Sequence, residues 1–210
     1  MVKEPITADA SSAEGDANDR KRSLTAPPWE QLALTAALAE DRALLTVLLQ
    51  LDHRLEHIVR SSSEPMLGQI RLAWWRDVLS KPTPPRGEPL IADIQAVRQT
   101  TAWPLDEVLL DIIEGWETLL LAPEELESSA AKRGGGVFRA FAGPGDWPQL
   151  DVAARSWALA DVANPVEAPA IGAMRAWPRR LRPLSLLALA GGAEGRFAGL
   201  RLSWHGLTGR

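Results

Sequence analysis

The stretch "EPMLGQIRLAWWRDVL", residues 64–79, decides how the fold of this chain is interpreted. Its apolar residues recur with the period of an α-helix, and Pro65 stands where the first helical turn accepts a proline. At about 100° per residue, the apolar side chains gather on one side of this helix. They are Leu67, Ile70, Leu72, Trp74, Trp75, Val78 and Leu79. Arg71 falls within the same arc, and Glu64 falls beside it, two turns earlier.

An arginine keeps its charge when it is buried, so Arg71 needs a partner or a wet cavity. The preceding predicted helix, near residues 41–60, carries Asp52 and Glu56 at the flanks of its apolar stripe, one turn apart. Two interpretations stay open. The charges form a buried ion pair that fixes the register of the helices, or they line an interior cavity together with Glu64 and Trp75.

Helical periodicity continues along most of the chain. Further helices are expected near 27–40, 89–101, 104–121, 123–143 and 146–164, with two or three shorter ones after them. The proline-rich segment "KPTPPRGEP", residues 81–89, cannot continue a helix. Because no stretch alternates at a period of two, strands are not expected. The sequence therefore predicts an all-α bundle of about eight to ten helices.

Composition favours one folded domain after a tail. The chain has 210 residues, 46% of them hydrophobic, and a net charge of −4, which argues against bulk attraction to nucleic acid. Residues 1–23 are polar and acidic, so we expect a disordered tail there and a domain over 24–210. No apolar run reaches the roughly 18 residues that span a bilayer. We expect a cytoplasmic protein with at most peripheral contact at the inner face of the membrane.

The residues at 64–76 also carry a family resemblance. "EPMLGQIRLAWWR" closely resembles the helix that follows the first aspartate-rich motif in the squalene/phytoene synthase family, and looks most like a divergent bacterial branch of it. Weaker similarity continues through "PLDEVLLDIIEGWETLLL" (104–121), "AAKRGGGVFRAFAG" (130–143) and "WPRRLRPLSLLALA" (177–190), over roughly residues 27–208. The resemblance implies an isoprenoid-synthase fold, with its helices arranged around a central cavity.

Active members of that family join two prenyl diphosphates head to head, and two Asp-x-x-x-Asp motifs on facing helices bind the diphosphates through Mg²⁺. Carboxylates one turn apart suit this ion, which takes oxygen ligands. Counting back from "GQIRLAWW" (68–75), the resemblance implies that the first motif falls at Glu56 and Arg60, where the arginine removes a ligand. In a shifted register it falls at Asp52 and Glu56. The second motif retains only Asp161. No complete pair of motifs is therefore present.

Three functions stay open. The first is a non-catalytic family member without a cofactor or a metal site, which binds a partner protein or a prenyl lipid. Degraded-site relatives among the respiratory complex I assembly factors suggest a role in assembling a membrane enzyme, by analogy only. The second is an active Mg²⁺-dependent prenyltransferase that condenses prenyl diphosphates with Asp52, Glu56 and Asp161. The third is a helical scaffold whose cavity has filled in.

Three smaller motifs are weaker signals. His53 and His57 lie four residues apart, as in zinc helices, but both are expected on a solvated face. The run "KRGGG", residues 132–136, lacks the spacing of a phosphate loop, so it predicts a helix distortion or close packing against a neighbour. The arginines of "WPRRLRP", residues 177–183, either start a surface helix or contact an acidic partner or lipid phosphates.

Overall fold

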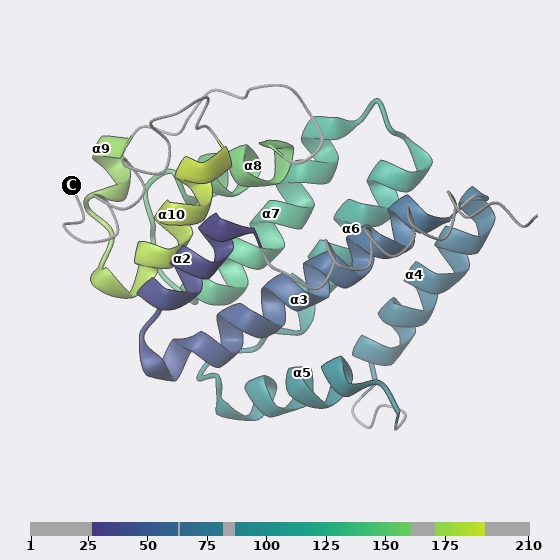
Figure 1. The fold of residues 1–210 in the computed structure, drawn as a ribbon, viewed down its shortest axis with the longest axis horizontal. Coiled ribbons are helices and arrows are strands. Elements are labelled where there is room, and N and C mark those ends of the chain that lie inside the picture. Colours follow the sequence, from purple (N-terminus) through teal and green to yellow (C-terminus); the bar gives the residue numbers. More distant parts are fainter. Residues whose placement is uncertain (1–26, 63, 82–86, 161–170, 192–210) are drawn as a thin grey trace, which may run out of the picture.

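The computed structural model describes residues 27–62, 64–81, 87–160 and 171–191, and within these ranges every regular element is a helix (Figure 1). The elements are α2 (Pro28–Ala36), α3 (Ala39–Ser61), α4 (Pro65–Leu79), α5 (Pro89–Thr100), α6 (Asp106–Leu121), α7 (Leu126–Ala142), α8 (Leu150–Ala160), α9 (Ile171–Met174), the 3₁₀ helix η1 (Arg179–Leu181) and α10 (Arg182–Gly191). The prediction of an all-α bundle is confirmed. The predicted tail boundary at residue 23 lies outside the described residues.

Prolines fix where several helices begin. Pro28, Pro65 and Pro89 occupy the first helical position of α2, α4 and α5. A proline is tolerated there because the backbone N–H that it lacks has no partner within the helix. At the other end of α7, Gly143 takes a φ of 69° while its N–H donates to the carbonyl of Arg139. This left-handed conformation ends the helix at little steric cost because glycine has no Cβ.

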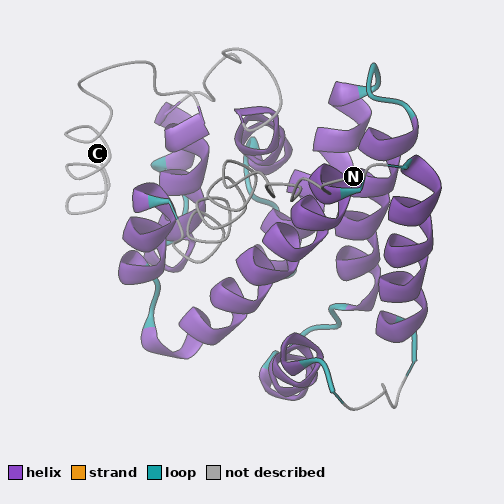
Figure 2. Ribbon diagram, turned by 45° about the vertical axis from the view of Figure 1, so that its right-hand side comes forward, coloured by secondary structure: helices purple, strands orange, loops and turns teal. Residues whose placement is uncertain are grey.

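The helices pack as a series of neighbours with α3 lying across them. Contacts join α4 to α6, α6 to α7, α7 to α8, α8 to α10 and α10 to α2. The long helix α3 contacts α2, α4, α5, α6 and α7, and Figures 1 and 2 show it running diagonally over the bundle. Residues far apart in the sequence therefore meet along α3.

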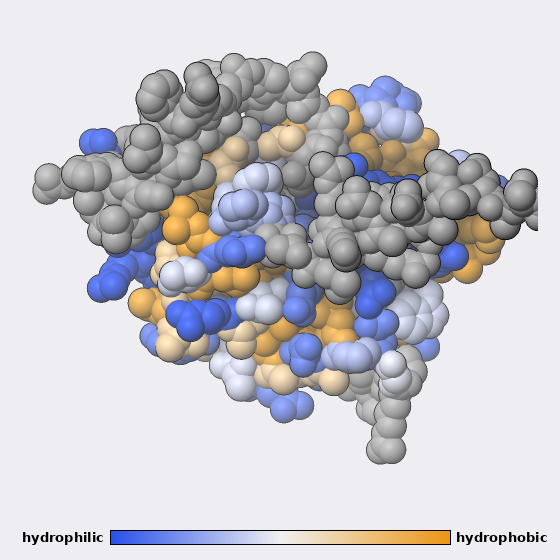
Figure 3. Space-filling view, viewed as in Figure 1, coloured by the Kyte–Doolittle hydropathy of each residue, from blue (hydrophilic) through white to orange (hydrophobic). Residues whose placement is uncertain are grey.

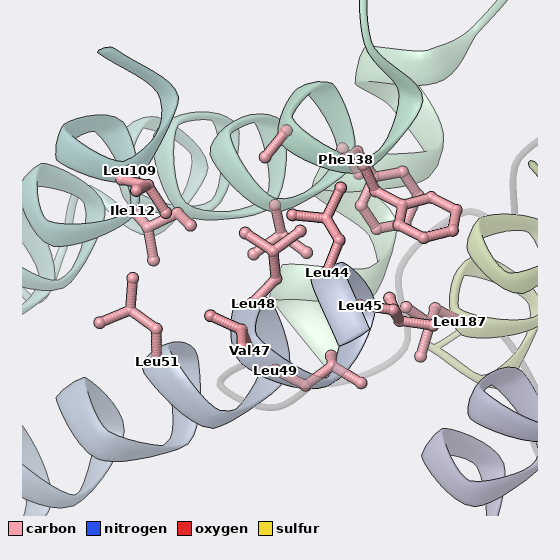
Figure 4. Close-up of a cluster of buried hydrophobic side chains, with 14 of the residues drawn as sticks. Leu44, Leu45, Val47, Leu48, Leu49, Leu51, Leu109, Ile112, Phe138 and Leu187 are labelled. Atoms are coloured by element: carbon pink, nitrogen blue, oxygen red, sulfur yellow. The ribbon is translucent and has the colours of Figure 1, made fainter. Parts of the chain in front are cut away.

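The main core lies beneath α3. Leu44, Leu48 and Leu51 of α3 point toward α6 and α7, where Leu109 and Phe138 are also buried (Figure 4). Each of these side chains is at most 5% exposed. Burial of one such side chain stabilises the fold by about 1.5–3 kcal/mol, so this interface fixes how α3 crosses the bundle.

Arg180, at the start of the C-terminal helices, holds together segments that are distant in sequence. Its Nε donates to both carboxylate oxygens of Asp41 in α3, at 3.2 and 3.0 Å. Its Nη1 and Nη2 donate to the carbonyls of Ala142 and Phe141, at 2.9 and 2.6 Å. The guanidinium also lies 4.7 Å from the centre of the Trp103 ring. This arginine of "WPRRLRP" therefore contacts an acid of its own chain.

Only part of the apolar arc predicted for α4 is buried. The helix buries Gly68, Leu72, Trp75, Val78 and Leu79. Gly68 allows close approach to α6, since a Cβ there would lie 2.8 Å from Leu120 Cδ2. The apolar arc of this helix is wider than one helix–helix contact covers, so its periodicity leaves open which part of the arc faces inward. The adjoining arc is exposed and holds Met66, Leu67, Ile70 and Trp74, at 68, 45, 60 and 44%.

Candidate functional site

The strongest polar feature of the interior is an ion pair between α3 and α7. Arg133 donates from Nε to Oδ1 of Asp52 at 2.8 Å and from Nη2 to Oδ2 at 2.7 Å. Both side chains are 2% exposed. A guanidinium matches a carboxylate in this two-bond geometry, which satisfies both charges away from water. The prediction that Asp52 points inward is thereby confirmed, and its partner comes from α7.

Two tryptophans and a backbone carbonyl complete the surroundings of this pair. Trp116 of α6 donates its indole N–H to Asp52 Oδ1 at 2.8 Å. The guanidinium carbon of Arg133 lies 4.2 Å from the centre of a Trp116 ring and 5.1 Å from that of Trp157 in α8. Nη1 of Arg133 donates to the carbonyl of Ala158 at 3.2 Å. Four helices thus contribute to a buried cluster of Asp52, Arg133, Trp116 and Trp157, the Asp52 cluster.

Glycines allow the helices to approach closely enough to form the Asp52 cluster. At Gly115 of α6, a Cβ would lie 2.5 Å from the backbone nitrogen of Arg133. At Gly134 it would meet the carbonyl oxygen of Ala154 in α8. At Gly136 it would lie 2.6 Å from Ile112 Cγ1 and 2.7 Å from a backbone carbonyl of α6. The run "KRGGG" therefore serves close packing of α7 on both neighbours, which was one of its two predicted roles.

A second group of charges lies on α3 near the first. His53 Nε2 is 2.8 Å from Oε2 of Glu30 in α2, a residue that is 4% exposed. His53 Nδ1 is 3.4 Å from Oε2 of Glu56, whose Oε1 is 2.8 Å from Nε of Arg60. His53 is half-buried and paired, so its prediction as a solvated residue is wrong, whereas His57 is exposed as predicted. We call Glu30, His53, Glu56 and Arg60 the His53 cluster.

These contacts shift the pKa values of two members of the His53 cluster. The hydrogen bond with Glu30, followed by that with Glu56, raises the pKa of His53 from 6.5 to about 10, against the effect of burial. Burial by itself would raise the pKa of Glu56. The hydrogen bond with His53 and the charges of Arg60 and Arg133 outweigh that effect, so the pKa of Glu56 lies below its ordinary value. His53 is therefore a cation and Glu56 an anion at neutral pH.

The acids on α3 do not suit a magnesium site. Asp52 and Glu56 keep the spacing of one turn that the family resemblance implies, but each carboxylate is already engaged by a cation of the chain. A dication would have to displace Arg133 from a buried position, and the arginine cannot lose its charge to make room. Among the described residues, no group of three or more metal-ligating side chains is placed to hold a metal ion.

The other predicted site residues lie elsewhere. Arg71 and Glu64 are exposed at the surface, so the predicted burial of Arg71, in an ion pair with an acid of α3 or beside Glu64 in a cavity, is wrong. The reason is that α4 buries only the part of its apolar arc that holds Leu72, Trp75 and Val78, and Arg71 lies at the edge of that part. Trp75 is buried at 3% and packs edge-to-face with Trp74, with ring centres 5.4 Å apart. Asp161 lies outside the described residues.

Sequence reasoning missed four residues of these clusters, Arg133, Trp116, Trp157 and Glu30. Arg133 stands directly before the three glycines, where a cation in a tightly packed helix was a signal of burial. Trp116 directly follows Gly115, the contact point of α6 with α7. Glu30 gave no such signal, because it lies in the first turn of α2, where an exposed acid is common.

No protein-family model, curated protein or solved structure matches this chain. Within the described residues, none of the helices combines the length and the apolar character needed to cross a membrane.

Proposed function

We propose that this protein is a non-catalytic member of the squalene/phytoene synthase family that binds a partner protein or a prenyl lipid. By analogy with degraded-site relatives of that family, the process would be the assembly of a membrane enzyme. The observation that carries the non-catalytic assignment is the ion pair between Asp52 and Arg133, because it occupies the first acid of the only Asp-x-x-x-Glu pair on α3.

The chemistry of diphosphate binding explains why this pairing matters. Head-to-head coupling needs metal ions that hold the leaving pyrophosphate, and those ions need free carboxylate oxygens. Asp52 accepts hydrogen bonds from Arg133 and Trp116, while Glu56 is shared between His53 and Arg60. The engagement of both acids supports a binding role over catalysis.

A turnover assay tests the non-catalytic assignment. The full chain is incubated with farnesyl or geranylgeranyl diphosphate and Mg²⁺, and pyrophosphate release is measured. We expect no release above a blank without protein. Mg²⁺-dependent release that disappears in the variant Asp52→Asn would overturn the proposal and establish the alternative, an active prenyltransferase.

Binding is measured separately. Tagged protein is captured from the membrane fraction of the cells that produce it naturally, and copurifying subunits of membrane enzymes are identified by mass spectrometry. In parallel, tryptophan fluorescence is titrated with farnesol and geranylgeraniol. We expect either a reproducible enzyme subunit or saturable prenyl alcohol binding. Recovery of the protein alone, together with no fluorescence change, would count against a binding role.

A further inference from the structure

We propose that α4 is the interface of a symmetric homodimer, in which two copies pack their α4 helices antiparallel and Glu64 of each copy pairs with Arg71 of the other. The starting point is the exposed apolar face of α4, which consists of Met66, Leu67, Ile70 and Trp74. Figures 1 and 2 both place α4 at the right-hand edge of the bundle, and Figure 3 shows apolar residues reaching the surface at that edge. Contiguous apolar faces of this kind mark interaction sites.

The spacing of this face matches a helix–helix seam. Leu67, Ile70 and Trp74 follow one another at intervals of three and four residues, which is the spacing of core positions between two packed helices. Met66 lies on one flank of the seam. The other helices of the described chain do not cover this face, since Ile70 is 60% exposed and Met66 is 68% exposed.

The charges beside the seam identify a second copy as the occupant. Glu64 and Arg71 both lie on the flank opposite Met66, seven residues apart, and both are exposed. Seven residues span about 10 Å along a helix, which is too far for these two side chains to pair within one helix. No hydrogen bond or ion pair engages either side chain within the described chain.

A second copy of α4 that runs antiparallel to the first provides a partner for both charges. When two copies of α4 run in opposite directions with their seams in contact, the same flank of each helix meets that of the other. Glu64 of one copy then faces Arg71 of the other, and the two-fold axis repeats the pair. In this register the two-fold axis lies between residues 67 and 68, so Leu67 and Ile70 of the two copies face one another in the shared seam, while Trp74 lies level with residue 61 of the other copy, before its α4 begins. This inference is independent of the proposed function, because it rests on α4 alone.

The test exchanges the charges at positions 64 and 71 and measures the oligomeric state of each variant. Sedimentation velocity and light scattering of the full chain should give a dimer that dissociates on dilution. Arg71→Glu and Glu64→Arg should each weaken association about tenfold, because each places like charges opposite one another twice in the dimer. The double variant E64R/R71E should restore association to within a few-fold of the original, which neither a lipid surface nor an unrelated partner protein would produce.

Ile70→Glu should abolish the dimer, whereas Val152→Glu, a matched change at an exposed residue of α8, should leave it intact. Thermal melting of each variant checks that the fold is kept. A monomeric chain at all concentrations, a dimer that survives Ile70→Glu, or a charge swap that fails to restore association would each overturn the proposal. A monomer that floats with phosphatidylglycerol vesicles and loses this property in Ile70→Glu would assign the face to lipid instead.

Discussion

Arg133 contacts both carboxylate oxygens of Asp52, 81 residues earlier in the chain, and neither side chain is more than 2% exposed. The pair joins α3 to α7, while Trp116 and Trp157 bring α6 and α8 to the same point. The carboxylate of Asp52 is thus paired with a cation of the chain itself. The consequences for stability can be measured directly.

Arg133→Leu should lower the free energy of unfolding by about 3–5 kcal/mol, because Asp52 is left buried without a compensating charge. Urea unfolding in dilute protein solution provides the measurement. Arg71→Leu is the matched control and should change the unfolding free energy by no more than about 0.5 kcal/mol, since Arg71 is exposed. Equal effects of the two changes would contradict this account of the interior. Replacing Asp52 and Arg133 together by leucine should recover much of the loss.

Gly134→Ala should destabilise the protein by about 1–3 kcal/mol, because the added methyl group meets the backbone carbonyl of Ala154 in α8. Gly135→Ala is the matched control in the same run. Its Cβ would meet only the end of the long Arg139 side chain, whose surface ion pairs with Asp111 and Asp151 contribute little. Because alanine also favours the helix, we expect a net change within about 1 kcal/mol. Thermal and urea unfolding compare the stabilities of the two variants. A Gly134→Ala variant as stable as the original chain would contradict close packing of α7 on α8.

Stability should decline as the pH rises from about 6.5 toward 10. His53 has a pKa of about 10 in the folded chain and of 6.5 in the unfolded one, mainly because of its hydrogen bond with Glu30. Its contribution is therefore complete below pH 6.5 and is lost progressively as the pH approaches 10. The chain has no cysteine or tyrosine, so few other side chains titrate in this window.

Urea midpoints between pH 6 and pH 10 measure this decline. His53→Gln should flatten the pH dependence, whereas His57→Gln, at an exposed position one turn later, should leave it as it is. A slope that persists unchanged in His53→Gln would assign the pH dependence to another group.

Arg180→Lys should cost about 1–2 kcal/mol, because lysine cannot reproduce the planar set of bonds to Asp41 and to two carbonyls. The loss should be local, so amide hydrogen exchange should speed up in α10 and at the end of α7 before it does in α3. Arg179→Lys, at the exposed neighbouring position, is the control and should leave exchange rates unchanged. Uniform acceleration over the whole chain would contradict a local role.

The sequence was sufficient for the fold class because two local signals agreed. Apolar residues repeat at the helical period, and Pro28, Pro65 and Pro89 mark helix starts that the structure confirms. The prediction that Asp52 points inward came from its place at the flank of the apolar stripe of α3, and α6 and α7 cover this side chain in the structure.

The sequence alone did not predict that Arg133 is the partner of Asp52, because this ion pair depends on which helices pack against one another. Arg71 lies in an apolar arc and Arg133 stands before three glycines, so the local sequence gives a reason to expect burial of either arginine. The two arginines differ in how their helices pack. Gly115 and Gly134 allow α7 to pack closely between α6 and α8, which buries Arg133. The helix α4 lies at the edge of the bundle, and Arg71 is exposed there. Tertiary contacts between helices therefore decide which of the two arginines is buried.

The distance in sequence between Asp52 and Arg133 also affects how the protein is made. A chain emerging from the ribosome exposes α3 well before α7 has been synthesised, so the acid has no counter-charge during that interval. Burying it early would be costly, and α3 should dock firmly only after residue 133 has left the exit tunnel. Chains stalled before that point should be digested readily by protease, and chains stalled well after it should resist digestion.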